Sequence, residues 1–141
     1  MQIEEIARLM VSKGKGILAA DESTGTMEKR LKSVNVPCTE KNRLSFRETL
    51  FSAPSMKSNI SGVILFEETL KQTSSKGLTI PELIKKNGSI PGIKVDKGAK
   101  QLAGSQNEKI TEGLDGLRER LKEYYKLGAK FTKWRGVYII S

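Results

Sequence analysis

The segment Gly16-Ile-Leu-Ala-Ala-Asp21 is a short apolar stretch that ends in a charged residue. Two later segments share this pattern, Gly92-Ile-Lys-Val-Asp-Lys97 and Phe131-Thr-Lys-Trp-Arg135. Each is suited to a buried β-strand, but an unpaired buried charge costs several kcal/mol. Charged residues within and after such strands therefore indicate a functional site.

Helical and strand patterns alternate along the rest of the chain. Apolar spacing predicts helices over 2–13, near 27–34, after Thr39, after Thr79, and over 110–124, where five apolar residues are spaced 4, 3, 4 and 3. Strands are expected at 17–20, at 62–66, from Gly92, and from Phe131 to the end of the chain. Four strands separated by helices predict the α/β class with a parallel sheet.

Two parallel architectures fit this order, a doubly wound sheet and a (β/α)8 TIM barrel. No Gly-x-Gly-x-x-Gly motif follows the first strand, since Gly14-Lys-Gly16 precedes it. Charges at the ends of several strands favour the barrel, whose active sites lie at that face. A full barrel takes about 250 residues. We therefore expect residues 1–141 to be the incomplete N-terminal portion of one barrel domain, truncated at Ser141, with about the first four strand-helix units.

The composition, with 37% hydrophobic and 29% charged residues, is that of a soluble globular protein. The longest apolar runs are far shorter than the roughly 20 residues that a membrane-spanning helix needs. The N-terminus is acidic, whereas a secretory signal begins with basic residues. We therefore expect no membrane association and a cytoplasmic location.

The net charge of +9 raises the question of a nucleic-acid partner. The basic residues are spread along the chain without a basic arm, so we do not expect nucleic acid to be the main partner.

Cys38 is the only cysteine and the chain has no histidine. We therefore expect a free thiol and no metal site of the zinc type.

Asp21 comes directly after the first strand and before Glu22-Ser-Thr-Gly25. One interpretation is that Asp21 caps the next helix, as Asp, Ser and Thr all do well. The other is a carboxylate at the strand end, with a hydroxyl-rich loop and helix N-terminus that could hold a phosphate. The two interpretations are compatible.

Basic side chains gather near the later strands. The period of two places Lys94 and Asp96 on one face of their strand, and likewise Lys133 and Arg135. Internal ion pairs are one explanation for each residue. Three cations near one strand end also suit an anionic ligand, and their places on two strands suggest more than one phosphate.

Five segments together resemble one family: Gly14–Gly25, Gly62–Phe66, Gly92–Gly98, Gly113–Leu117 and Phe131–Arg135. They are similar, in the same order, to class I fructose-1,6-bisphosphate aldolases. The resemblance implies a (β/α)8 barrel, a homotetramer when full length, and no cofactor or metal. It implies the reversible cleavage of fructose 1,6-bisphosphate to dihydroxyacetone phosphate and glyceraldehyde 3-phosphate, through a lysine Schiff base, in glycolysis and gluconeogenesis.

The resemblance also implies roles for single residues. Asp21 would match a carboxylate that orients the Schiff-base amine, and Lys133 a lysine that assists proton transfer beside the imine. The C6-phosphate pocket would take in Ser23, Thr26 and Lys94. Two arginines match positions associated with substrate phosphate, Arg30 and Arg43, and Arg135 is the basic neighbour of Lys133.

In that family, the lysine that attacks the ketone, the acid-base glutamate and the C1-phosphate loops all lie on later strands. The sequence to Ser141 contains none of these segments, so we expect the chain alone to be inactive. Two alternatives stay open. One is a binding fragment without catalysis, and the other is a distinct barrel aldolase that uses Lys133 itself as the Schiff-base nucleophile.

Overall fold

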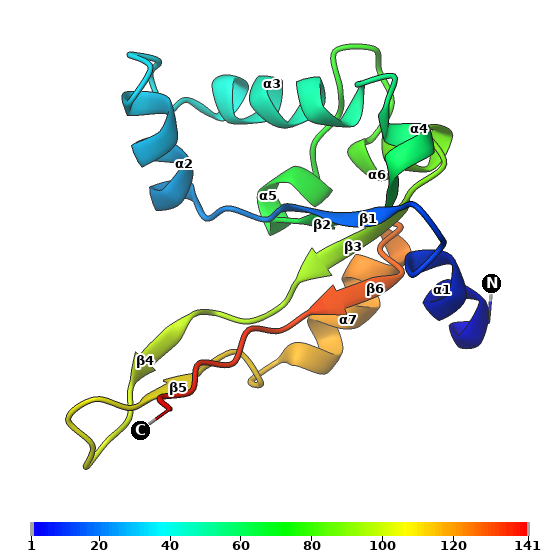
Figure 1. Ribbon diagram of the computed structural model, residues 1–141. Coiled ribbons are helices and arrows are strands. Elements are labelled where there is room, and N and C mark those ends of the chain that lie inside the picture. The colour runs from blue at the N-terminus through cyan, green and yellow to red at the C-terminus, as the bar shows by residue number, and fades with distance from the viewer. Residues whose placement is uncertain (1, 141) are drawn as a thin grey trace.

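The computed structural model describes residues 2–140. Its main sheet has four parallel strands that pair in chain order: β1 (Gly16–Ala20), β2 (Ile60–Leu65), β3 (Ile90–Lys94) and β6 (Phe131–Lys133). The α/β class with a parallel sheet is thus confirmed. Because all four strands run the same way, their carboxyl ends lie along one edge of the sheet (Figure 1).

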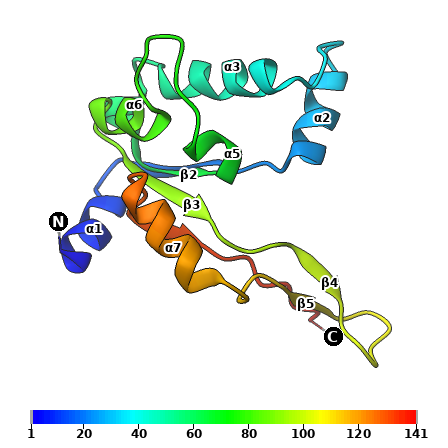
Figure 2. The same ribbon diagram turned by 180° about the vertical axis from the view of Figure 1, so that it is seen from behind.

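Seven helices accompany the strands within residues 2–140: α1 (Ile3–Met10), α2 (Thr24–Lys32), α3 (Glu40–Phe51), α4 (Met56–Asn59), α5 (Glu67–Leu70), α6 (Ile80–Lys86) and α7 (Leu117–Lys126). Figure 2 shows the sheet from behind, with α7 in front of β6 and α1 near the amino ends of the strands. None of the seven is long and apolar enough to cross a lipid bilayer.

One face of the sheet packs on the helices and forms the core. Val63, Leu65 and Ile93 on this face are buried against apolar side chains of α3, α6 and α7. Because side chains alternate along a strand, Ile17 and Lys94 lie on the opposite face, which we call the inner face. Ile17 is 43% exposed there, so within residues 2–140 the inner face lacks a covering layer at this position.

Two helices begin where their capping residues predict. The Thr39 hydroxyl accepts a hydrogen bond from the Asn42 amide at the start of α3. Thr79 and Glu82 form a reciprocal capping box at the start of α6. These caps fix where two core-covering helices start, and so place their apolar residues over the sheet.

The helix expected over 110–124 is wrong in its first half. Ile110 lies in β5 (Lys109–Thr111), which pairs with β4 (Ala99–Gln101) in an antiparallel hairpin that extends beyond the carboxyl ends of the sheet (Figure 1). Leu114 is 71% exposed, and α7 begins only at Leu117. Gly113 and Gly116 have φ values of 129° and 64°, which a right-handed helix does not allow.

The fourth strand is also shorter than expected. β6 ends at Lys133, and residues 134–140 have no regular secondary structure. The expected truncation falls on Ser141, which lies outside the described residues. The last described segment runs beside the hairpin, where the Thr111 hydroxyl donates to the Arg135 carbonyl at 2.7 Å.

Candidate active site

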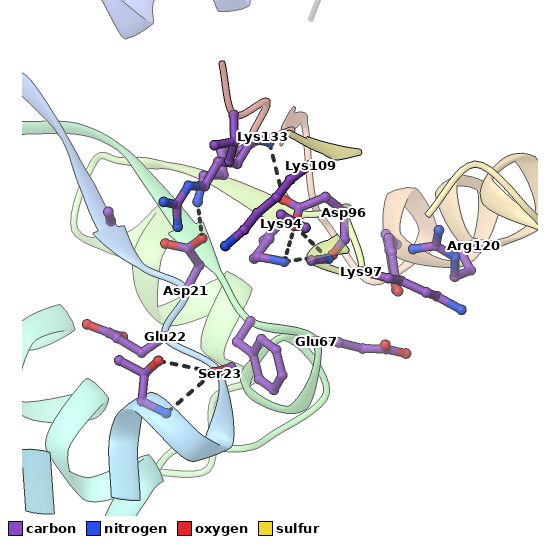
Figure 3. A pocket seen from close by; sticks show the side chains of 18 of the residues that line it. Asp21, Glu22, Ser23, Glu67, Lys94, Asp96, Lys97, Lys109, Arg120 and Lys133 are labelled. Atoms are coloured by element: carbon purple, nitrogen blue, oxygen red, sulfur yellow. Dashed lines mark hydrogen bonds and ion pairs between the residues drawn. The ribbon is translucent and has the colours of Figure 1, made fainter. Parts of the chain in front are cut away.

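A pocket of about 880 Å³ lies at the carboxyl edge of the sheet (Figure 3). The ends of β1, β3 and β6, the start of α2 and the β4–β5 hairpin all contribute side chains to it. It therefore lies at the edge where the charged strand ends of the sequence meet.

Asp21 and Lys133 form an ion pair in the pocket. The Lys133 Nζ atom donates to Asp21 Oδ2 at 2.6 Å, and Asp21 is only 9% exposed (Figure 3). The cap of α2 is Ser23, whose Oγ accepts from the Thr26 amide at 3.4 Å. The interpretation of Asp21 as the helix cap is therefore wrong, because its carboxylate faces the pocket and binds the lysine.

This contact joins the two edge strands of the sheet. β1 and β6 are three strand spacings apart, which in a flat sheet is about 14 Å. The side chains of Asp21 and Lys133 nevertheless meet, so the sheet curves toward its inner face at this end.

Lys94 and Asp96 form a second pair at the end of β3. Lys94 Nζ lies 2.6 Å from Asp96 Oδ1, and the amides of Gly98 and Arg135 donate to the same carboxylate at 3.1 and 3.3 Å. Burial raises the pKa of Asp96, but these hydrogen bonds outweigh it and hold the pKa below its usual value. Asp96 thus stays ionised and ties the end of β3 to the end of β6.

The start of α2 brings three of the expected phosphate-binding residues to the pocket. Ser23 and Thr26 lie with their hydroxyl oxygens 3.2 Å apart at the helix N-terminus. Arg30 lines the pocket one turn later and pairs with Glu22. A helix N-terminus with two hydroxyls and a nearby arginine is a suitable anion site.

Arg43 lies elsewhere. It does not line the pocket, and its guanidinium donates to both carboxylate oxygens of Glu68, with Nε to Oε2 at 2.9 Å. This pairing raises the pKa of Arg43 and holds the pKa of Glu68 below its usual value. Arg43 therefore joins α3 to α5, and the structure does not bring it to the other candidate residues.

Several residues line the pocket although the sequence analysis did not place them in the site. The lining includes seven cationic and four acidic side chains, so an anion would meet net positive charge. Sequence reasoning did not assign Glu22, Lys97, Lys109 and Arg120 to it. Lys109 lies just before the helix expected over 110–124, and the β4–β5 hairpin brings it to the pocket (Figure 3). Lys97 lies three residues after the end of β3, and this place after a strand end could have indicated it.

Comparison with known proteins gives the family. The sequence model described as glycolytic fructose-bisphosphate aldolase class-I matches residues 2–141. The chain belongs to the class-I fructose-bisphosphate aldolase family. A relative in Xylella fastidiosa, named as a probable fructose-bisphosphate aldolase class 1, is 54% identical over 140 residues, which are 99% of this chain and 42% of that relative.

Members of the family in other organisms are equally similar. Fructose-bisphosphate aldolase 6, cytosolic, of Arabidopsis thaliana is 58% identical over 91% of this chain and 36% of its own length. A solved Plasmodium falciparum fructose-bisphosphate aldolase, in complex with TRAP and a small molecule inhibitor, matches 97% of this chain with a TM-score of 0.93 and 50% identity. This chain covers 40% of that structure.

Proposed function

We propose that residues 2–140 form the N-terminal part of a fructose-bisphosphate aldolase active site. The reaction is the reversible cleavage of fructose 1,6-bisphosphate to dihydroxyacetone phosphate and glyceraldehyde 3-phosphate through a lysine Schiff base. The observation that carries the proposal is the 2.6 Å contact between Lys133 and Asp21 in a net cationic pocket at the carboxyl edge of a parallel sheet. The family membership supports it.

The same proposal gives the chain the first four strands of a (β/α)8 barrel. Two features support this. The strands pair in chain order, as barrel strands do, whereas a doubly wound sheet reverses its order at a switch point. The contact between the edge strands requires curvature toward the inner face, which is the direction in which a barrel closes.

The residues of the pocket fall into two groups by their chemistry, one suited to proton transfer and one suited to binding phosphate. Asp21 and Lys133 can hold and move a proton beside the imine, and their charges can stabilise it. Ser23, Thr26, Arg30, Lys94 and Arg135 line the same pocket and suit substrate phosphate. The imine itself needs a second lysine on a later strand, because its protonated nitrogen takes up the electrons of the carbon–carbon bond that breaks.

Lys133 is a poor candidate for that nucleophile. The attacking nitrogen must approach the carbonyl carbon of the substrate, and the Lys133 Nζ atom is held instead at 2.6 Å from the Asp21 carboxylate. The distinct aldolase that uses Lys133 predicts that borohydride and dihydroxyacetone phosphate trap an adduct on this chain. We expect no adduct, and a stoichiometric mass increase that maps to Lys133 would favour that alternative.

The decisive experiment is a chimera in which this chain replaces the matching segment of the Xylella fastidiosa relative, which supplies the later strands. We expect the chimera to cleave fructose 1,6-bisphosphate and the 141-residue chain alone to be inactive. A folded but inactive chimera would overturn the proposal and favour a binding fragment.

A homotetramer and a cytosolic location belong to the same proposal. The names of the plant relatives support the cytosolic location.

A further inference from the structure

Arg47 on α3 is a fully buried arginine that does not line the pocket. Its side chain is 0% exposed, and burial lowers its pKa. Nη1 donates to Thr69 Oγ1 at 2.8 Å, and Nη2 donates to the backbone carbonyl of Glu22 at 2.5 Å. The guanidinium therefore links three separate segments: α3, α5 and the loop after β1.

Two carboxylates partly balance this buried charge. Nη2 lies 3.6 Å from Glu22 Oε2, and Nη1 lies 3.9 Å from Glu68 Oε2. Neither is a close ion pair, since Glu68 binds Arg43 more closely and the other Glu22 oxygen binds Arg30. Replacing such a buried network by apolar residues is often neutral or stabilising, so stability alone is a weak reason for an arginine here.

The contact with Glu22 lies one residue from the proposed catalytic carboxylate. The Glu22 carbonyl belongs to the planar peptide group that joins Glu22 to Ser23, so the hydrogen bond from Arg47 fixes the loop one residue after Asp21 and restricts the path from Asp21 to the cap of α2. Asp21 must face Lys133 across the pocket to reach it at 2.6 Å. The Glu22 side chain, which Arg47 faces from the core, also holds Arg30 at the pocket.

We propose that Arg47 is a positioning residue that acts through Glu22: it holds the loop after β1 so that Asp21 meets Lys133 and Arg30 stays at the pocket. The inference rests on the proposed function for what Asp21 and Arg30 do. Its geometric part, the hold on the Glu22 segment, does not depend on catalysis.

Kinetics in the chimera test the effect on the reaction. Arg47→Met removes both donors and the charge, and we expect kcat to fall by about tenfold to a hundredfold at a temperature well below the melting temperature of every variant. Arg47→Lys keeps the charge but cannot reproduce the two-donor fork, so it should restore only part of the loss. Arg8→Met, a change of an exposed arginine on α1, is the matched control.

Proteolysis tests the hold on the loop directly. A glutamyl endopeptidase cuts after glutamate, and Glu22 is shielded while the exposed Glu108 in the hairpin is accessible. With Glu108 as internal reference, we expect cleavage after Glu22 in the chimera to be about tenfold faster in Arg47→Met than in the parent and in Arg8→Met.

The outcomes separate the two proposals. If the parent chimera is folded and inactive, the proposed function fails. The rate of cleavage after Glu22 then tests by itself whether Arg47 restrains the loop after β1. If the parent is active and Arg47→Met keeps kcat within twofold while its melting temperature falls, Arg47 only stabilises the fold and the inference is wrong. Unchanged cleavage after Glu22 overturns it as well.

Discussion

At the scale of single residues, the Asp21 carboxylate is almost enclosed and carries the charge closest to Lys133. Asp21→Asn keeps the volume but removes the charge. We expect kcat of the chimera to fall by about a hundredfold with a small change in KM, because a positioned acid-base group is lost. Steady-state kinetics check this, with the exposed Glu28→Gln as control. An unchanged kcat would mean that the contact is only structural.

Lys94 should act on binding. Lys94→Ala leaves Asp96 with its two amide donors, so the end of β3 keeps its shape. We expect KM for fructose 1,6-bisphosphate to rise about tenfold or more, and KM for fructose 1-phosphate, which lacks the C6 phosphate, to change little. Lys100→Ala on the exposed hairpin is the matched control. Equal effects on both substrates would refute the assignment to the C6 phosphate.

Arg43 should act on stability. Because it pairs with Glu68 away from the pocket, Arg43→Met should lower the free energy of unfolding of the chimera by about 1 to 2 kcal/mol at pH 7 without raising KM. The pKa of Glu68 is lowered in the folded state, so the pair stabilises above about pH 4.3 and loses this contribution as the pH falls through the lowered value. Urea unfolding of parent and variant at several pH values should show the difference shrink with acid. A constant difference would contradict the pairing.

The sequence predicts individual pocket residues only where a local pattern carries them. The period of two places Lys94 beside Asp96, and the two form an ion pair. The approach of Lys133 to Asp21 depends on a curved sheet, which no short segment encodes. Arg47 follows no motif, and its contacts come from α5 and the loop after β1.

At the scale of elements, the contact of β3 with β6 depends on the absence of a side chain at Gly92. A Cβ there would lie 2.4 Å from the Phe131 ring, which also covers Gly62. Gly92→Ala should therefore destabilise the chimera by about 1 to 3 kcal/mol, because the ring must move. Thermal unfolding checks this. Phe131→Leu should recover part of the loss in the double variant, and strict additivity of the two changes would contradict the steric cause.

The arrangement of elements also explains why the helix expected over residues 110–124 was wrong in its first half. Leu117, Leu121 and Tyr124 follow helical spacing and do pack on the core. Ile110 extends that spacing by coincidence, since it pairs with Lys100 in the hairpin. Two glycines with positive φ separate the segments, and a periodicity of apolar residues does not report them.

At the scale of the whole molecule, β1 and β6 are edge strands without a second neighbour among the described residues. Exposed edges and an inner face with Ile17 in contact with solvent favour association with other chains. We expect the 141-residue chain alone to form oligomers or aggregates in light scattering coupled to size exclusion, and the chimera to give a defined assembly. A monodisperse monomer with a sharp thermal transition would contradict this.

The pairing of strands in chain order has a consequence for synthesis on the ribosome. Each strand of the main sheet pairs with the main-sheet strand made before it, so the sheet can grow outward as the chain emerges and no strand has to enter between two older ones. Lys133 reaches Asp21 across 112 residues of sequence. The proposed proton-transfer pair therefore forms only with the last of these four strands, and until then a nascent chain has the proposed phosphate-binding end of α2 without Lys133.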